Sequence, residues 1–173
     1  MALDTSLRVL AIDPGPTESG YVLLGSKILD MGKVDNDYME GLIFSKLIAV
    51  SKPLVAVEIV KSYGMPAGDS LFRTMWYCGR FSLAVDMMGY FYEEVTRKEV
   101  VTYMCGTSKA GDSNVRQALI DRFEPELEPR HRPKGFLKGV SNDIWSALAI
   151  AVYVRDNYDL KHKRIWKGKN FLK

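Results

Sequence analysis

The chain is poor in the residues that build disulfide frameworks and zinc sites. Its 173 residues include two cysteines, Cys78 and Cys105, which lie far apart without a CxxC pair, and only two histidines, His131 and His162. This scarcity argues against a disulfide scaffold and against a Cys/His zinc centre. We therefore expect reduced, packed thiols and a cytoplasmic location.

Long apolar runs are also missing. No stretch of about 18 apolar residues occurs, so the sequence predicts no membrane-spanning helix. The opening residues "MALDTSLRVL" lack a basic region followed by a long apolar one, and we expect no secretory signal. A length of 173 residues and a 47% hydrophobic composition favour a single globular domain with a substantial core.

Charge is unevenly distributed. The net charge is only +3, but residues 161–173 contain six Lys or Arg and no acid, so the rest carries 18 basic and 21 acidic residues. This asymmetry predicts a body, 1–160, a basic tail, 161–173, and a polyanionic partner. A solvated tail that aids solubility is the alternative. The basic residues expected to contact nucleic acid are Lys161, Lys163, Arg164 and Lys167 in the tail, and Arg130, Arg132, Lys134 and Lys138 in a proline-containing loop.

Hydrophobic patterning predicts a mixed sheet flanked by helices. The expected strands are Arg8–Asp13, Gly20–Leu24, Ile28–Val34, Leu54–Val60 and a run, "EVVTYM", within Glu94–Met104. The expected helices are Asp37–Val50, Ser70–Met88, Asn114–Phe123 and Ser141–Tyr158. Three consecutive strands with short turns suit an antiparallel meander, and the following strand–helix units suit parallel pairing. The predicted fold class is therefore α/β.

Three acids interrupt otherwise apolar segments. Asp13 follows "VLAI", Glu58 lies inside "VAVEIV", and Asp143 precedes "IWSALAIAV". A carboxylate in such a setting loses hydration and is costly unless a charge or hydrogen-bond donors compensate. If the three converge, a cation bound between them would explain all three positions. Carboxylate oxygens without Cys or His favour Mg²⁺ or Mn²⁺, and a pair of ions would suit phosphodiester hydrolysis.

Each acid taken singly has a simpler interpretation. Asp13 precedes a Pro-Gly turn and could serve only as a turn former. Glu58 could face water on an edge strand, and Asp143 could be only a helix N-cap. The ordered combination on separate elements favours the metal site.

The same residues resemble a known family. "LAIDPGPTESGY", "VAVEIV" and "SNDIWSALAIAV" resemble, in that order, the motifs of RuvC-type Holliday junction resolvases within the ribonuclease H-like nuclease superfamily. "SYGMP", "GRF" and "NVRQALIDRF" resemble most the phage-encoded branch. The resemblance implies a ribonuclease H-like, five-stranded sheet, a homodimer, four-way DNA junctions as substrate, and Asp13, Glu58 and Asp143 as ligands of Mg²⁺ or Mn²⁺. For a phage-encoded protein, the location would be the host cytoplasm.

The sequence also departs from that family. Bacterial members carry a second acid, or a histidine, one turn into the final helix, where this chain has Ser146. Asp112 is the alternative fourth ligand, and it lies near the register of a bacterial lysine. Lys109, three residues upstream, is the other candidate catalytic residue.

Other functions remain open. A debranching nuclease of broader specificity, an RNA-processing relative and a junction-binding protein without catalysis would share much of the pattern. "DPGPTESG" also resembles the phosphate-binding turn of the actin and sugar-kinase ATPases, but 173 residues leave no room for their second domain.

Overall fold

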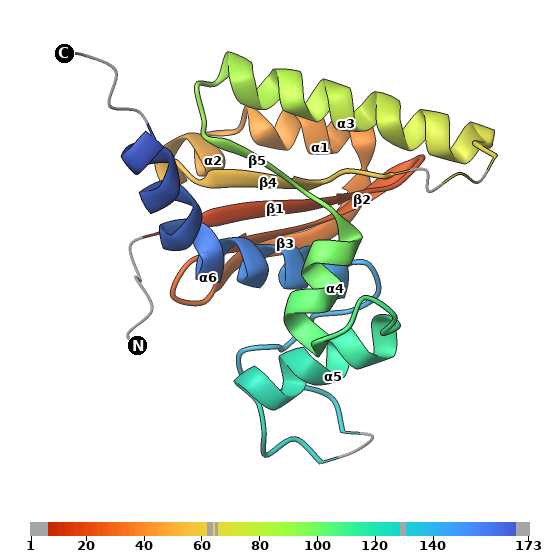
Figure 1. Cartoon of the computed structure of the whole chain (residues 1–173), viewed down its shortest axis with the longest axis vertical. Helices are drawn as coiled ribbons and strands as arrows, with labels where there is room; N and C mark the ends of the chain where they lie inside the picture. Colours follow the sequence, from red (N-terminus) through yellow and green to blue (C-terminus); the bar gives the residue numbers. More distant parts are fainter. Residues whose placement is uncertain (1–6, 62–63, 65, 129–130, 169–173) are drawn as a thin grey trace.

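A five-stranded mixed sheet forms the centre of the computed structural model (Figure 1). Residues 7–61, 64, 66–128 and 131–168 are described, residues 46, 50 and 159–168 by their backbone alone. The strands are β1 Val9–Pro14, β2 Glu18–Leu24, β3 Ile28–Asp35, β4 Leu54–Glu58 and β5 Tyr92–Val95. The helices are α1 Asn36–Ile43, α2 Lys46–Ser51, α3 Asp69–Met87, α4 Arg97–Cys105, α5 Asp112–Phe123 and α6 Ile144–Gly168.

The strand order is β3-β2-β1-β4-β5. Strands β1, β2 and β3 pair antiparallel, whereas β4 pairs parallel with β1 and β5 parallel with β4. The predicted fold class, three antiparallel strands followed by parallel strand–helix units, is confirmed.

Each face of the sheet has its own hydrophobic core. Helices α1 and α3 cover one face, where Leu10, Ile12 and Phe81 are fully buried. Helix α6 lies across the other face, with α4 and α5 beyond it (Figure 1). Residues 147–154 are almost completely buried because α6 is packed between the sheet and these two helices. Of the described helices, none combines the length and apolar character needed to cross a membrane.

Two predicted elements were wrong. The run "EVVTYM" is not a strand but most of α4, because Thr96 and Glu99 form a reciprocal capping box and Gly106, at a φ of 72°, ends the helix. The fifth strand is the short β5 that precedes it. The helix expected over Asp37–Val50 is divided into α1 and α2, because Ser45 caps a new helix by accepting a bond from the Ile48 amide.

The long loop after α5 is more firmly held than its composition indicates. The Glu124 carboxylate accepts hydrogen bonds from the backbone amides of Lys134, Gly135 and Leu137. Leu137 is fully buried, and the Phe136 ring stacks on Phe123 with centroids 4.2 Å apart. These contacts fix one side of the loop against the body.

The final helix extends past the predicted boundary at residue 160, since the α6 backbone continues to Gly168. The side chains of Lys161, Lys163, Arg164 and Lys167 lie outside the described part of the chain, as does Arg130 entirely.

Candidate active site

Asp13 and Glu58 end neighbouring parallel strands at the same level. Strand β1 pairs Ile12 with Val57 of β4, so the next residue on each strand is one of these acids. Neighbouring strands lie about 4.8 Å apart. Because side chains alternate along a strand, both carboxylates project toward the face covered by α6, away from Ile12 and Val57.

Asp143 reaches the same place from α6. Its carbonyl accepts a bond from the Ala147 amide, so its backbone takes the N-cap position of the helix. On the sheet, Asp13 pairs with Gly20 of β2. A Cβ added at Gly20 would lie 2.8 Å from the Asp143 carbonyl oxygen, so the start of α6 rests directly on this glycine. Asp143 is thereby held above the end of β1.

The Asp143 carboxylate is engaged by a lysine in this structure. Lys33 of β3 lies 3.0 Å from Asp143 and 3.1 Å from Glu18, and these two hydrogen-bonded carboxylates raise the pKa of Lys33. Among the described residues, no three His, Cys, Asp or Glu side chains are grouped closely enough to hold a metal ion. The three acids meet at one end of the sheet, but their carboxylates are not gathered around one point.

Burial makes the two strand-end carboxyls weak acids. Burial, and then the charge of Asp143, raises the pKa of Asp13 to about 6, although Arg97 and a hydrogen bond to Ser146 oppose the shift. Burial, and then the charge of Asp13, raises the pKa of Glu58 to about 7, again against Arg97. Both carboxyls therefore favour the protonated form more than a solvated acid does, and the charge of Arg97 offsets their burial only in part.

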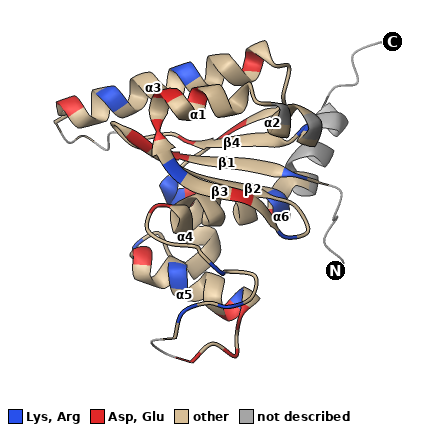
Figure 2. Ribbon diagram, turned by 180° about the vertical axis from the view of Figure 1, so that it is seen from behind, with Lys and Arg blue, Asp and Glu red and all other residues tan. Residues whose placement is uncertain are grey.

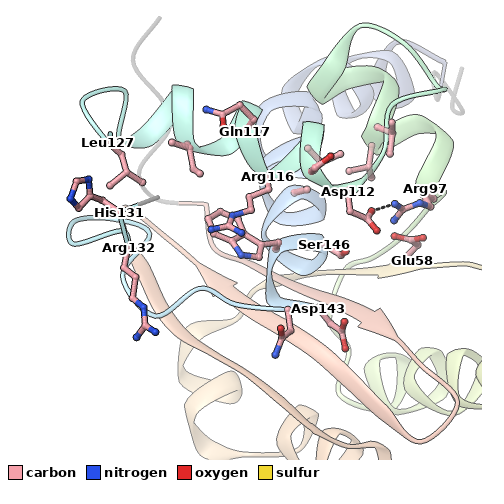
Figure 3. Close-up of a pocket in the computed structure, with 18 of the residues that line it drawn as sticks. Glu58, Arg97, Asp112, Arg116, Gln117, Leu127, His131, Arg132, Asp143 and Ser146 are labelled. Atoms are coloured by element: carbon pink, nitrogen blue, oxygen red, sulfur yellow. Dashed lines mark hydrogen bonds and ion pairs between the residues drawn. The ribbon is translucent and has the colours of Figure 1, made fainter. Parts of the chain in front are cut away.

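A cleft of about 810 Å³ opens beside these acids, between α4, α5, α6 and the loop after α5 (Figure 3). Its floor is apolar, with Val100, Val101 and Trp145 among the lining residues. Its polar lining consists of Glu58, Arg97, Asp112, Ser113, Arg116, Gln117, Glu128, His131, Arg132, Asn142, Asp143 and Ser146. The Arg116 guanidinium lies over the Trp145 ring, 5.1 Å from its centroid. The cleft thus carries three arginines, Arg97, Arg116 and Arg132, among carboxylates that include Glu58 and Asp143.

The other predicted site residues are divided between the cleft and the surface. Asp112 lines the cleft and forms an ion pair with Arg97. Arg132 also lines it, whereas Lys134 and Lys138 are exposed on the loop. Lys109 is exposed between α4 and α5 and is not among the residues that line the cleft.

Arg97, Arg116 and Lys33 were missed by sequence reasoning. Arg97 directly follows Thr96 at the end of β5, and Val95 of β5 pairs with Glu58. The rule that parallel strands end at one edge places Arg97 beside Glu58 once β5 is known, but the sequence pattern puts that strand several residues too late. No comparable signal pointed to Lys33 or Arg116.

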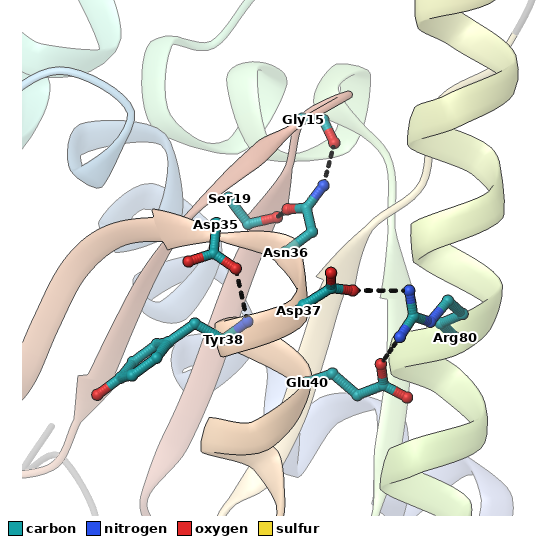
Figure 4. Close-up of polar contacts among 8 residues, drawn as sticks. All are labelled: Gly15, Ser19, Asp35, Asn36, Asp37, Tyr38, Glu40 and Arg80. Carbon is teal, nitrogen blue, oxygen red and sulfur yellow. Dashed lines mark hydrogen bonds and ion pairs between the residues drawn. The ribbon is translucent and has the colours of Figure 1, made fainter.

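Buried polar contacts hold the turn that follows Asp13 (Figure 4). The Ser19 hydroxyl donates to the Asn36 side-chain oxygen at 2.6 Å, and the Asn36 amide donates to the Gly15 carbonyl at 3.0 Å. Ser19 and Asn36 are almost completely buried. Nearby, Arg80 of α3 forms ion pairs with Asp37 and Glu40 of α1. The end of β1 is thus rigidly supported from the face opposite α6.

Neither the protein-family models nor the curated proteins give a match to this chain. Solved structures do. RuvC of T. thermophilus in complex with a Holliday junction substrate matches with a TM-score of 0.69 at 18% identity, over 90% of this chain and 96% of that one. Another structure of Thermus thermophilus RuvC matches with a TM-score of 0.65 at 20% identity, over 90% of this chain and 97% of that one.

A eukaryotic structure gives a similar result. The yeast mitochondrial Holliday junction resolvase, Ydc2, matches with a TM-score of 0.56 at 16% identity, over 99% of this chain and 89% of that one. In each case the similarity extends over nearly the whole of both chains. The protein therefore has the fold of RuvC, a ribonuclease H-like mixed sheet flanked by helices.

Proposed function

We propose that this chain is a metal-dependent, structure-selective DNA endonuclease that resolves four-way junctions by paired phosphodiester hydrolysis. The observation that carries the proposal is the meeting of Asp13, Glu58 and Asp143 at one end of an arginine-lined cleft. A matching fold in a RuvC bound to a Holliday junction substrate supports the choice of DNA structure. The similarity to phage-encoded members remains an expectation from the sequence motifs.

The donor set fits Mg²⁺ or Mn²⁺ in chemical type. Asp13 and Glu58 offer hard oxygen ligands. A divalent cation would offset both the cost of burying their charges and the repulsion between them. Asp143 would complete the set by exchanging its contact with Lys33 for the ion. When bound, such ions lower the pKa of a coordinated water and stabilise the leaving oxygen.

The protein residues would position the reacting groups. Rigid strand ends fix Asp13 and Glu58, and Ser146 orients the Asp13 carboxylate through its hydrogen bond. Arg116 and Arg132 offer positive charge along the cleft for the phosphates of one strand. Two exposed lysines of the loop, Lys134 and Lys138, would add to this positive charge. We also propose, from their charge alone, that DNA is contacted by Arg130 and by the tail residues Lys161, Lys163, Arg164 and Lys167.

We further propose a homodimer, because a four-way junction needs two symmetric cuts. An apolar stripe on the outward face of α3 supports this proposal. Its members are the exposed side chains Phe72, Met75, Trp76, Leu83 and Met87. They recur at helical spacing, so a second copy could cover them together.

With both cysteines free, we place the protein in a cytoplasm, that of the host if it is phage-encoded.

The test is cleavage of a labelled four-way junction by the wild type, Asp13→Asn and Glu58→Gln, with Mg²⁺ and with EDTA. Paired, metal-dependent cuts should fall by about 10²-fold or more in both variants, while junction binding persists. Glu94→Gln is the matched control, because this exposed carboxylate on β5 projects to the opposite face of the sheet from Glu58 and should cut normally.

Other outcomes would change the assignment. Equal cutting of flaps and three-way junctions would indicate a broader debranching nuclease. Cleavage confined to substrates that contain RNA would indicate an RNA-processing enzyme. Junction binding without cleavage in Mg²⁺ or Mn²⁺ would contradict the catalytic proposal and indicate a binding protein.

A further inference from the structure

An arginine lies where the acids and the cleft meet. Arg97 is the first residue of α4, immediately after β5 and its cap Thr96. Its guanidinium forms an ion pair with the carboxylate of Asp112, the first residue of α5 (Figure 3). Both side chains line the cleft and both are accessible, with 49% of the Arg97 side chain and 79% of the Asp112 side chain exposed.

Arg97 faces more negative charge than this single partner. Glu58 and Asp13 also act on it electrostatically, so carboxylates from three different elements raise the pKa of one guanidinium, and Asp112 is the one in direct contact with it. In Figure 3, Arg97 lies beside Asp112, with Glu58 directly below it. The arginine is thus a cation of the cleft that acts directly on both strand-end acids, since its charge lowers the pKa of Asp13 and of Glu58 against the effect of burial.

We propose that Arg97 binds a DNA phosphate next to the cleavage site, and that Asp112 is a latch which occupies Arg97 until DNA arrives. A phosphate would take the place of the Asp112 carboxylate on the guanidinium. This inference rests on the function proposed above and names a positioning pair within that site.

The exchange is chemically reasonable. A guanidinium presents the same fork of N–H donors to a carboxylate and to a phosphate, so one can replace the other without rearranging the arginine. An ion pair as exposed as this one is weak and exchanges readily. The phosphate needs such a partner, because Glu58 and Asp13 would otherwise repel it.

The latch has a measurable consequence. Every phosphate that binds Arg97 must release Asp112, so Asp112 should oppose DNA binding and should do so only through Arg97. If Asp112 were instead a fourth metal ligand, its removal would weaken metal binding. Its effect on DNA affinity in the absence of metal would then not depend on whether Arg97 is present.

The experiment is a double-mutant cycle in EDTA, with Asp112→Asn, Arg97→Gln and the double variant. Affinity for a labelled four-way junction and for a linear duplex would be measured across about 50–200 mM salt. We expect Asp112→Asn to bind the junction roughly 3–10-fold more tightly than the wild type. Arg97→Gln should bind roughly 5–20-fold more weakly, and the slope of log affinity against log salt concentration should be smaller in magnitude by about one. In the Arg97→Gln background, Asp112→Asn should change affinity by less than about twofold.

Two controls separate the latch from general charge and from folding. Asp121→Asn removes another exposed acid of α5, one that accepts a hydrogen bond from Gln117, and its effect should be small and equal in both backgrounds. Arg97→Lys retains the charge without the fork, so it should bind between the wild type and Arg97→Gln. Arg97→Met, which also removes the cation, replaces Arg97→Gln in the cycle if that variant does not fold.

The remaining outcomes each decide the question. An Asp112→Asn effect of the same size in both backgrounds overturns the latch, because Asp112 would then act only as a repulsive charge. Loss of Mg²⁺-induced thermal stabilisation in Asp112→Asn, with unchanged DNA affinity, overturns it in favour of a metal ligand. Equal wild-type affinity for duplex and junction contradicts junction selectivity, while the cycle still decides the latch. No DNA binding by the wild type overturns both proposals.

Discussion

At the scale of single residues, the strand-end acids are held in an unfavourable state. Asp13 and Glu58 are buried close to each other, and the cations around them only partly compensate. A carboxyl whose pKa is higher in the folded than in the unfolded protein stabilises the fold at low pH and loses that contribution as the pH rises. At neutral pH, the charges of these two carboxylates therefore destabilise the metal-free fold. Such a loss of stability is expected at a site arranged for binding a ligand.

Asp13→Asn should reveal this cost. The pKa of Asp13 rises from 3.8 to about 6 on folding, so the metal-free wild type should lose stability as the pH rises from about 4 to about 7. Asparagine removes the charge, and thermal melts in EDTA should show a gain of about 1–3 kcal/mol at about pH 8 and almost none near pH 4. The exposed Glu94→Gln control should show no such pH-dependent gain. An Asp13→Asn variant no more stable than the wild type at about pH 8 would contradict this account of the site.

The same residues show what the sequence alone could reveal. Asp13, Glu58 and Asp143 were identified because each interrupts an apolar run, and that pattern is visible in the order of residues. Lys33 and Arg116 carry no such signal, because a basic residue on a strand or helix surface is ordinary. Their positions beside Asp143 and Trp145 depend on the packing of distant elements.

At the scale of secondary-structure elements, the carboxyl ends of β1, β4 and β5 and the start of α6 build the site together. Strands β1 to β4 were predicted because alternation and apolar runs mark them clearly. The four-residue β5 was not, since so short a strand leaves almost no pattern and the β-branched residues of α4 imitate one. That single displaced strand is why Arg97 was overlooked.

The contact between β2 and α6 gives the prediction that belongs to this scale. In Gly20→Ala, the new methyl would lie 2.8 Å from the Asp143 carbonyl oxygen, and the start of α6 would have to move. We expect a loss of about 1–3 kcal/mol in the free energy of unfolding and a lower Mg²⁺ affinity by calorimetry. Gly41→Ala in α1 is the control: its Cβ meets open space, and it should be neutral or stabilising by about 0.5–1 kcal/mol. Equal behaviour of the two variants would mean that Gly20 does not position Asp143.

At the scale of the whole molecule, the two faces of the sheet have different surroundings. On the α6 face lie the cleft and its arginines, whereas the opposite face is covered by α1 and α3. Figure 2 shows few charged positions on that helix, and these are Asp69, Arg73, Arg80 and Asp86. Under the proposed function, catalysis and self-association would therefore use different surfaces, and the cleft would stay accessible to DNA in the proposed dimer.

The α3 stripe can be tested by placing a charge in its centre. The Leu83 side chain is 60% exposed, so Leu83→Asp should not disturb the core. In a dimer, however, the charge would be buried, and we expect the dissociation constant to rise by about 100-fold or more. Light scattering would show a monomer in place of the wild-type dimer, and cleavage would change from paired cuts to single nicks.

Leu29→Asp, on β3 and 40% exposed, introduces the same charge away from the stripe and should leave the dimer and the paired cuts intact. A Leu83→Asp variant that stays dimeric would mean that another surface pairs the two active sites, and a monomeric wild type that still makes paired cuts would remove the need for a dimer.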